Sequence, residues 1–169
     1  MNWNAIGAIG QVVAATAVVI SIIYLAIQIR QNTRSTKLEA ERDIALGLAK
    51  SLQDAAPTTL PGIFVRGSTD PTNATEEELA QFGFFVLGFF RIVQHAHDQR
   101  IEGNLSDRSW ESVQTFLVTQ LRAPGIRAMW KIRGDTYKPE FQAFVNSLAI
   151  DESQLSGADA LRKFKELKL

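Results

Sequence analysis

Hydrophobic and polar positions divide the chain into two unlike parts. Residues 5–29 form an apolar run that contains no charged side chain. The polar side chains within it are Gln11, Thr16, Ser21, Tyr24 and Gln28. As a helix, these 25 residues rise about 37 Å, and the hydrocarbon core of a bilayer is roughly 30 Å thick. Because a helix pairs its backbone N–H and C=O groups internally, the run predicts a transmembrane helix over residues 1–30.

A cleaved signal peptide is the alternative interpretation of this run. Such a peptide needs a basic start, a short apolar core and a small-residue cleavage site. The segment from Met1 to Asn4 carries no basic residue, and the apolar run is longer than the short core of a signal peptide. These features favour a helix that is retained.

Basic residues beside the run predict its orientation. No basic side chain precedes the run, whereas Arg30, Arg34 and Lys37 follow it. Since basic flanks stay on the cytoplasmic side, we expect the N-terminus outside and residues 30–169 in the cytoplasm. Trp3 would lie at the outer interface of the bilayer, and the three basic residues would anchor the inner one.

One face of the predicted span is lined mainly with small residues. On a helical wheel its members follow one another at intervals of three and four, with a glutamine at the border and another at the end. They are Gly7, Gly10, Gln11, Ala14, Ala17, Ser21 and Gln28. Small residues let helices approach closely, and polar ones hydrogen-bond between them. We therefore expect a homo-oligomer, or docking on another membrane protein. The alternative is chance, because Gly and Ala are common in membrane helices.

Helical spacing of apolar residues continues after the run. The chain has no proline between residues 29 and 56, and Ile44, Leu48 and Leu52 recur at intervals of four. This predicts that the span continues as a helical stalk over residues 31–56, weakened at Gly47. Prolines at positions 57 and 61 end the stalk.

Thr75 and Glu78 have the spacing of a capping box, which predicts a helix up to about Glu102 that Gly103 stops. Its centre, Phe82 to Val93, is strongly apolar. A second span is the alternative, but this run is about twelve residues long and a span needs about twenty. We expect a central core helix.

Four shorter helices are predicted after Gly103. Ser106 or Asp107 caps the first, whose inner face carries Trp110, Val113, Leu117 and Leu121. The second holds Met129 and Trp130. The third begins at Pro139, with Phe141, Phe144, Val145 and Leu148 inward. The last carries Leu161, Phe164 and Leu167. No segment alternates with a period of two, so the expected fold class is all-α: a transmembrane helix, a stalk, and a small cytoplasmic helical bundle over residues 57–169.

Several stretches resemble a known group of proteins. They are AIGAIG near the start, YLAIQIRQNTR from Tyr24 to Arg34, RGSTDP from Arg66 to Pro71, the segment from Gly103 to Trp110, and the segment from Pro124 to Trp130 with Glu140-Phe141. In these stretches the chain is similar to small proteobacterial single-span membrane proteins, up to about Ile150. The resemblance implies a single-span helical membrane protein. It implies no activity, cofactor or catalytic residue.

Composition and motifs exclude several classes of chemistry. Lys plus Arg and Asp plus Glu are equal at 18 each, which argues against nucleic acid as a partner. The absence of cysteine excludes disulfides and thiolate sites. No GxSxG, GxxxxGK[ST] or HExxH motif occurs. We therefore expect no enzymatic activity, no cofactor and no metal.

Three groups of polar residues are candidate sites. His95 and Asp98 could share an ion, but zinc sites need three or four ligands, so an ordinary helical histidine is favoured. Glu102 and Glu111 flank a turn without any sign of a cleft. The arginines of the central helices could meet an anion, but ion pairing is favoured; they are Arg91, Arg100, Arg108, Arg122, Arg127 and Arg133.

The C-terminal segment is basic and amphipathic. Its basic residues are Arg162, Lys163, Lys165 and Lys168. Such a helix can lie on an anionic leaflet. Packing on the bundle, or fraying, is the favoured alternative, because the apolar face is small.

Taken together, these features predict a non-enzymatic inner-membrane protein that self-associates or docks on a membrane complex through its span. It would act as a scaffold or accessory subunit. The alternative is an oligomeric pore or a ligand-sensing membrane effector, in which the polar residues of the span would line a channel.

Overall fold

The computed structural model describes residues 3–166, and this part of the chain is helical, without a strand. It divides into two compact units, Met1–Glu39 and Ala40–Leu169. The all-α class predicted from the sequence is therefore confirmed.

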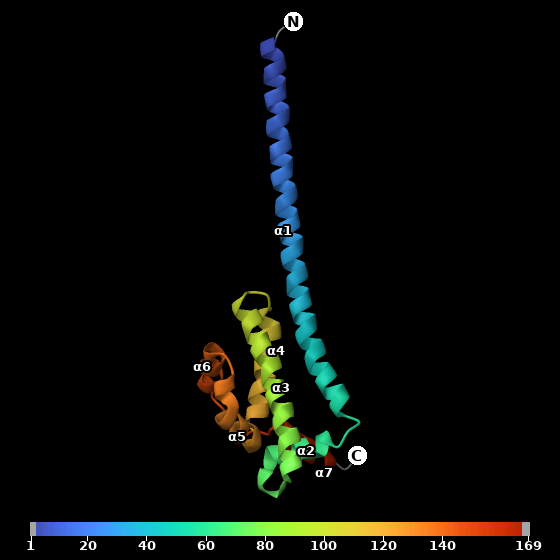
Figure 1. Ribbon diagram of the computed structural model, residues 1–169, viewed down its shortest axis with the longest axis vertical. Helices are drawn as coiled ribbons and strands as arrows, with labels where there is room; N and C mark the ends of the chain where they lie inside the picture. The colour runs from blue at the N-terminus through green and yellow to red at the C-terminus, as the bar shows by residue number, and fades with distance from the viewer. Residues whose placement is uncertain (1–2, 167–169) are drawn as a thin grey trace. The chain divides into compact units, whose positions relative to one another are not determined.

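The first unit belongs to helix α1, Trp3–Ala55, which is continuous through Gly47 (Figure 1). Its described large apolar side chains from Ile9 to Ile29 are exposed. By length and composition, two described helices are able to cross a membrane: α1 from Ile9 to Ala55, and α3, Glu76–Ile101. The apolar side chains of the first unit have no core of their own to fill, whereas those of α3 do.

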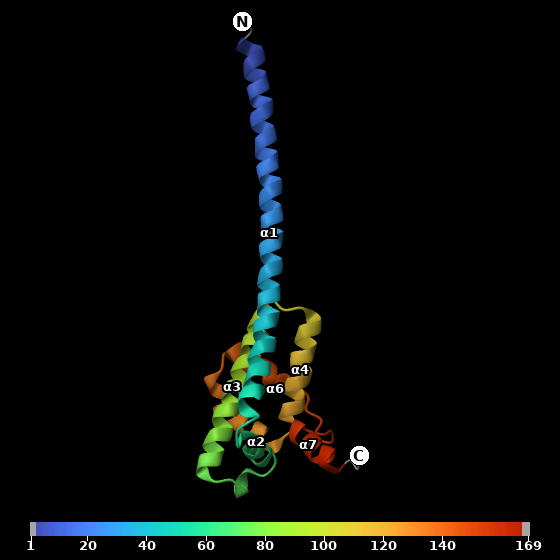
Figure 2. The same ribbon diagram turned by 90° about the vertical axis from the view of Figure 1, so that its right-hand side faces the viewer.

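The second unit contains the end of α1 and all later elements (Figure 2). The helices in order are α2, Leu60–Thr69; α3; α4, Asp107–Leu121; α5, Pro124–Arg133; α6, Pro139–Ser147; and α7, Gly157–Glu166. Two short 3-10 turns, η1 at Pro71–Asn73 and η2 at Gly134–Thr136, connect them. Every predicted helix is present, and Pro124 and Pro139 each begin one.

Local signals set the ends of α3 and α4. Thr75 accepts a hydrogen bond from the backbone N–H of Glu78, whose carboxylate accepts one from the backbone of Thr75, so the predicted capping box is confirmed. Gly103 ends the helix with φ +75°, a left-handed conformation that glycine adopts without strain. Ser106 is the N-cap of α4.

Helix α3 is the centre of the core and packs against α2, α4 and α5. Its side chains at Phe82, Val86, Phe90 and Val93 are almost fully buried. They follow at intervals of three and four, which places them on one face of the helix. Around them lie Leu117 of α4, Ile126 of α5 and Phe141 of α6. The prediction of a core helix here is confirmed.

The core extends into α1. Ala40 and Ile44 are buried, and Leu48 packs against the core. The compact unit therefore begins at Ala40. The prolines at positions 57 and 61 predict a later start, at residue 57. Glu41 fixes this part of α1 to the first turn of α4, because its carboxylate accepts hydrogen bonds from the hydroxyls of Ser106, 2.6 Å, and Ser109, 2.9 Å.

On α4 and α6, the predicted inner faces are only partly buried. Val113 and Leu117 are buried, whereas Trp110, Phe144 and Leu148 are half-buried against the core. On α7, Phe164 is 67% exposed, so this side chain is not packed on the bundle. Leu161, Arg162, Lys165, Leu167 and Lys168 of the predicted amphipathic segment lie outside the side chains that the structure describes.

Two glycines allow α2 and α5 to approach closely. A Cβ atom on Gly125 would lie 1.8 Å from the carbonyl oxygen of Gly67, and a Cβ atom on Gly67 would lie 2.5 Å from the ring of Phe82. Neither contact is sterically allowed, so both positions need glycine.

We expect Gly125→Ala to destabilise the second unit by at least the roughly 1–3 kcal/mol typical of overpacking, since its methyl group would meet backbone. The matched control is Gly62→Ala, whose Cβ would meet only the end of the Arg66 side chain, at 3.8 Å. Alanine favours a helix over glycine by about 1 kcal/mol, so the control should be neutral or stabilising. Urea unfolding of both full-length variants measures the difference. Equal midpoints would contradict this packing.

Candidate functional site

The residues predicted for a membrane interface all lie on α1 and are exposed. They are Gly7, Gly10, Gln11, Ala14, Ala17, Ser21 and Gln28. A Cβ atom built on Gly7 or Gly10 would meet no atom within 4 Å. This face therefore has room for a close neighbour.

Polar side chains on this face are hydrogen-bonded within the helix. The Ser21 hydroxyl donates to the carbonyl oxygen of Ala17 at 2.9 Å, and the Gln28 amide donates to the hydroxyl oxygen of Tyr24 at 2.9 Å. Such internal bonds lower the cost of placing these groups in apolar surroundings.

The predicted interface anchors flank the apolar run. Arg30, Arg34 and Lys37 are exposed. Trp3 begins α1, and its side chain lies outside the described ones.

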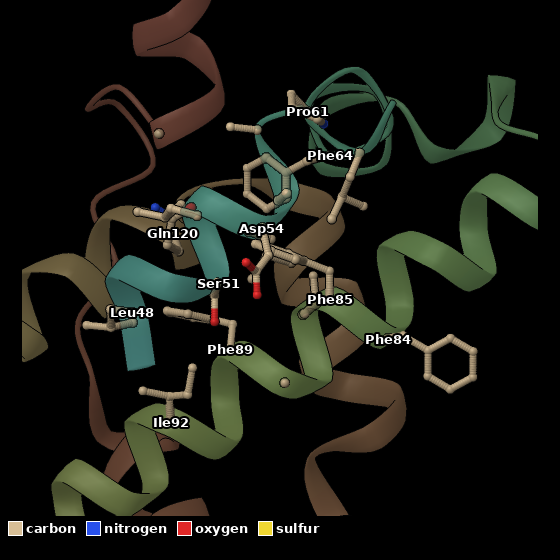
Figure 3. Close-up of a pocket in the computed structure, with 18 of the residues that line it drawn as sticks. Leu48, Ser51, Asp54, Pro61, Phe64, Phe84, Phe85, Phe89, Ile92 and Gln120 are labelled. Carbon is tan, nitrogen blue, oxygen red and sulfur yellow. The ribbon is translucent and has the colours of Figure 1, made fainter. Parts of the chain in front are cut away.

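A cavity of about 720 Å³ lies within the second unit (Figure 3). Its walls come from the end of α1, from α2, from α3 and from α4. On two of these helices the lining residues follow the helical pattern i, i+3, i+4 and i+7. On α1 these are Leu48, Ser51, Leu52 and Ala55; on α3 they are Phe85, Gly88, Phe89 and Ile92. The helical repeat thus turns one stripe of each helix toward the same space.

Aromatic rings line the cavity. Phe64 and Phe85 meet edge to face with centroids 5.5 Å apart, and Phe89 meets Phe116 in the same way at 5.6 Å. This arrangement is a favoured one for aromatic pairs and holds the walls in place. Phe84, at the rim, points away from the cavity and is 75% exposed (Figure 3).

Apart from the Gln120 amide, the polar side chains in the lining offer acceptors rather than free donors. Ser51 donates its proton to the carbonyl oxygen of Gly47 at 2.8 Å, and Thr58 donates to that of Ala55 at 2.6 Å. The Gln120 side-chain oxygen is buried and has no partner among the described residues. Asp54 contributes a carboxylate, directed with Ser51 at the space beside Phe85 and Phe89 (Figure 3). No described lining residue is Lys or Arg.

Sequence reasoning did not find this cavity. The stripe Phe85, Gly88, Phe89 and Ile92 was visible, but it is indistinguishable from a packed core face. In the described structure, a Cβ atom built on Gly88 would have no atom within 4 Å, which shows that this stripe is not covered at Gly88.

His97, rather than His95, is the buried histidine of α3. Its ring is stacked on Phe144, with centroids 5.0 Å apart, and also contacts Phe141 and Trp110. Its Nδ1 atom is buried without a hydrogen-bond partner among the described residues. Burial lowers the pKa of the His97 imidazole, and the nearby carboxylates of Asp98 and Glu140 oppose this only in part.

Two of the other polar candidates, Asp98 and Glu102, have structural partners. Asp98 accepts a hydrogen bond from Lys138 at 2.8 Å, and Glu102 accepts one from the Asn104 side chain at 3.2 Å. Among the described residues, no group of three or more His, Cys, Asp or Glu is placed to hold a metal ion.

Four of the candidate arginines bind within the fold, and Arg100 does so through an ion pair with Asp107. Arg91 lies over the ring of Tyr137, 4.5 Å from its centroid. Arg127 donates to the carbonyl oxygens of Leu121 and Arg122, and Arg122 donates to that of Leu155. These arginines join helices and loops, as expected for structural residues.

Comparison of the chain with protein-family models, with curated proteins and with solved structures finds no match. Function is therefore inferred from the residues and their arrangement.

We expect the free energy of unfolding to decrease as pH falls from about 7 to 5, in part because of His97. Its folded pKa lies below the unfolded value of 6.5, so the unfolded state binds the proton more readily in this range. The stability that the neutral imidazole contributes is present above the unfolded pKa and is lost as pH falls toward the folded pKa.

Urea titrations of the full chain in a nonionic detergent measure this effect. His97→Leu should show a shallower pH dependence than the wild type, whereas the exposed control His95→Leu should keep the wild-type slope. Equal slopes for all three proteins would rule out His97 as a contributor.

Proposed function

We propose that this chain is a non-enzymatic protein anchored in the bacterial inner membrane by α1. It self-associates through the small-residue face, Gly7 to Gln28, and holds its helical domain at the cytoplasmic surface as a scaffold or accessory subunit. The observation that supports this most is the first part of α1. It is a continuous helix with exposed Ile, Val and Leu side chains and no charge before Arg30.

Exposed apolar surface of this extent is typical of membrane-spanning or partner-binding segments. A helix in lipid has every backbone group satisfied, and α1 meets this condition throughout the run. Basic residues at the end of the run favour the cytoplasmic side for the domain. Together these features support membrane anchoring over a soluble coiled coil, which would alternate apolar and charged stripes.

The small-residue face supports self-association. Gly7 and Gly10 leave open space beside the helix, and lipid chains fill such a groove less closely than a second helix does. Because Ser21 and Gln28 hydrogen-bond within α1, packing is favoured over a polar lumen.

We expect the full chain to stay with membranes after extraction at high pH, as an integral protein does. Val19→Arg with Ile23→Arg should release it, since an arginine at the centre of a span costs about 2.5–3.5 kcal/mol on insertion scales. Immunoblots of the pellet and the supernatant measure the distribution. Complete release of the wild-type chain would show that α1 does not span.

Replacing Gly10 and Ala14 by isoleucine should abolish most self-association, because the added side chains prevent close approach of two helices. The matched control places the same residue at Ala15 and Ala26, on another side of α1. Crosslinking in native membranes compares the yields of the dimer band. If both double variants retain the wild-type yield, the small-residue face is not the interface.

A further inference from the structure

The cavity of the second unit is a hollow that the fold leaves unfilled. Its volume of about 720 Å³ is within the range of small-molecule sites. Leu48 is only partly buried against the core beside it, and Leu52 is 57% exposed. An apolar hollow holds water poorly, so an apolar guest would gain the burial of these surfaces.

The polar groups decide which kind of guest fits. Asp54 is an acceptor, and the buried oxygen of Gln120 has no partner among the described residues. Ser51 and Thr58 have already donated their protons to backbone carbonyls. The lining therefore complements a ligand that carries hydrogen-bond donors or positive charge.

Lys50 is the group that such a ligand would have to replace. Its ammonium lies 3.0 Å from the Asp54 carboxylate, and both side chains are largely exposed. An exposed pair four residues apart on a helix contributes little to stability, so Asp54 can exchange this partner.

We infer that this cavity binds a single-chain cationic amphiphile, such as an alkyl amine. Its hydrocarbon chain lies between Phe64, Phe85 and Phe89, and its ammonium group donates to the Asp54 carboxylate. An anionic amphiphile of the same length is disfavoured, because its carboxylate would face Asp54 and would find no Lys or Arg in the described lining. This site goes beyond membrane anchoring and does not depend on self-association.

Gly88 provides a way to close the cavity without disturbing the fold. A Cβ atom there would meet nothing within 4 Å, so Gly88→Leu places a side chain in the hollow and not against a neighbour. Replacing a glycine within α3 also favours the helix. Asp54→Asn independently removes the charge while keeping the size of the side chain.

The test uses the full chain in nanodiscs of zwitterionic lipid and two photoreactive probes, a diazirine-bearing dodecylamine and the matched dodecanoate. Mass spectrometry maps and quantifies the labelled residues, which separates cavity binding from partition into the lipid around α1. We expect the amine probe to label residues 48–64 and 85–92 at least about tenfold more than the carboxylate probe does. Excess dodecylamine should remove this labelling.

Gly88→Leu and Asp54→Asn should each lower cavity labelling by the amine about tenfold, and the latter should also remove the preference for the amine. His95→Leu is the matched control: it adds the same side chain two turns along α3, outside the cavity, and should label as the wild type does. Circular dichroism verifies that each variant is folded. If Gly88→Leu is not folded, Asp54→Asn decides the outcome alone.

Several results would overturn this inference. They are equal labelling by the two probes, preference for the carboxylate, and unchanged labelling in a folded Gly88→Leu variant. A crosslink from the cavity to a second copy of the chain in place of the probe would show that a protein segment, not an amphiphile, fills it.

Discussion

Burial of one face of α3 is the interaction on which the second unit depends. Phe82, Val86, Phe90 and Val93 are almost fully removed from water, and each large apolar side chain contributes about 1.5–3 kcal/mol when buried. No other described helix has a buried face of this length. The surrounding helices are short, at 9 to 15 residues, and isolated helices of that length are marginal in water. They are therefore stable because α3 gives their apolar faces a surface to pack on.

Because the second unit depends on packing against α3, some of its positions do not accept a larger residue. The approach of α5 to α2 brings the Gly125 backbone against the carbonyl group of Gly67, and Gly67 in turn lies against the ring of Phe82. A single helix position thus sets the spacing of three helices. At the opposite end of the same core, Glu41 ties α1 to the start of α4, and the hydroxyls of Ser106 and Ser109 lower the pKa of its carboxyl group. Because its pKa is depressed in the folded state, this contact stabilises the fold above the ordinary carboxyl range and is lost in acid.

The face of α3 that points toward the end of α1 is not fully packed. Gly88 leaves a gap where a larger residue would have completed the packing. The aromatic pairs at its sides hold the walls in place, and Asp54, paired with Lys50, contributes an exposed carboxylate to the lining. This open space between aromatic walls is the one that the proposed amphiphile would fill. The proposed anchor and this site serve separate purposes: the first concerns where the domain lies, and the second what it recognises.

The sequence by itself determined the helices and their ends, because those signals are local. Thr75 with Glu78, Gly103, Ser106, Pro124 and Pro139 each act within one helical turn, and the apolar repeat of α3 identifies its buried face without reference to partners. The charge-free run was likewise evident as a helix able to span a membrane. Only the tertiary structure decided that the compact unit begins at Ala40, that His97 and not His95 is buried, and that Gly67 meets Gly125. Only the tertiary structure showed which side of α3 lines the cavity and which side is packed in the core. These features depend on residues far apart in the chain, and a helical repeat states which side chains share a face but not whether another helix covers it.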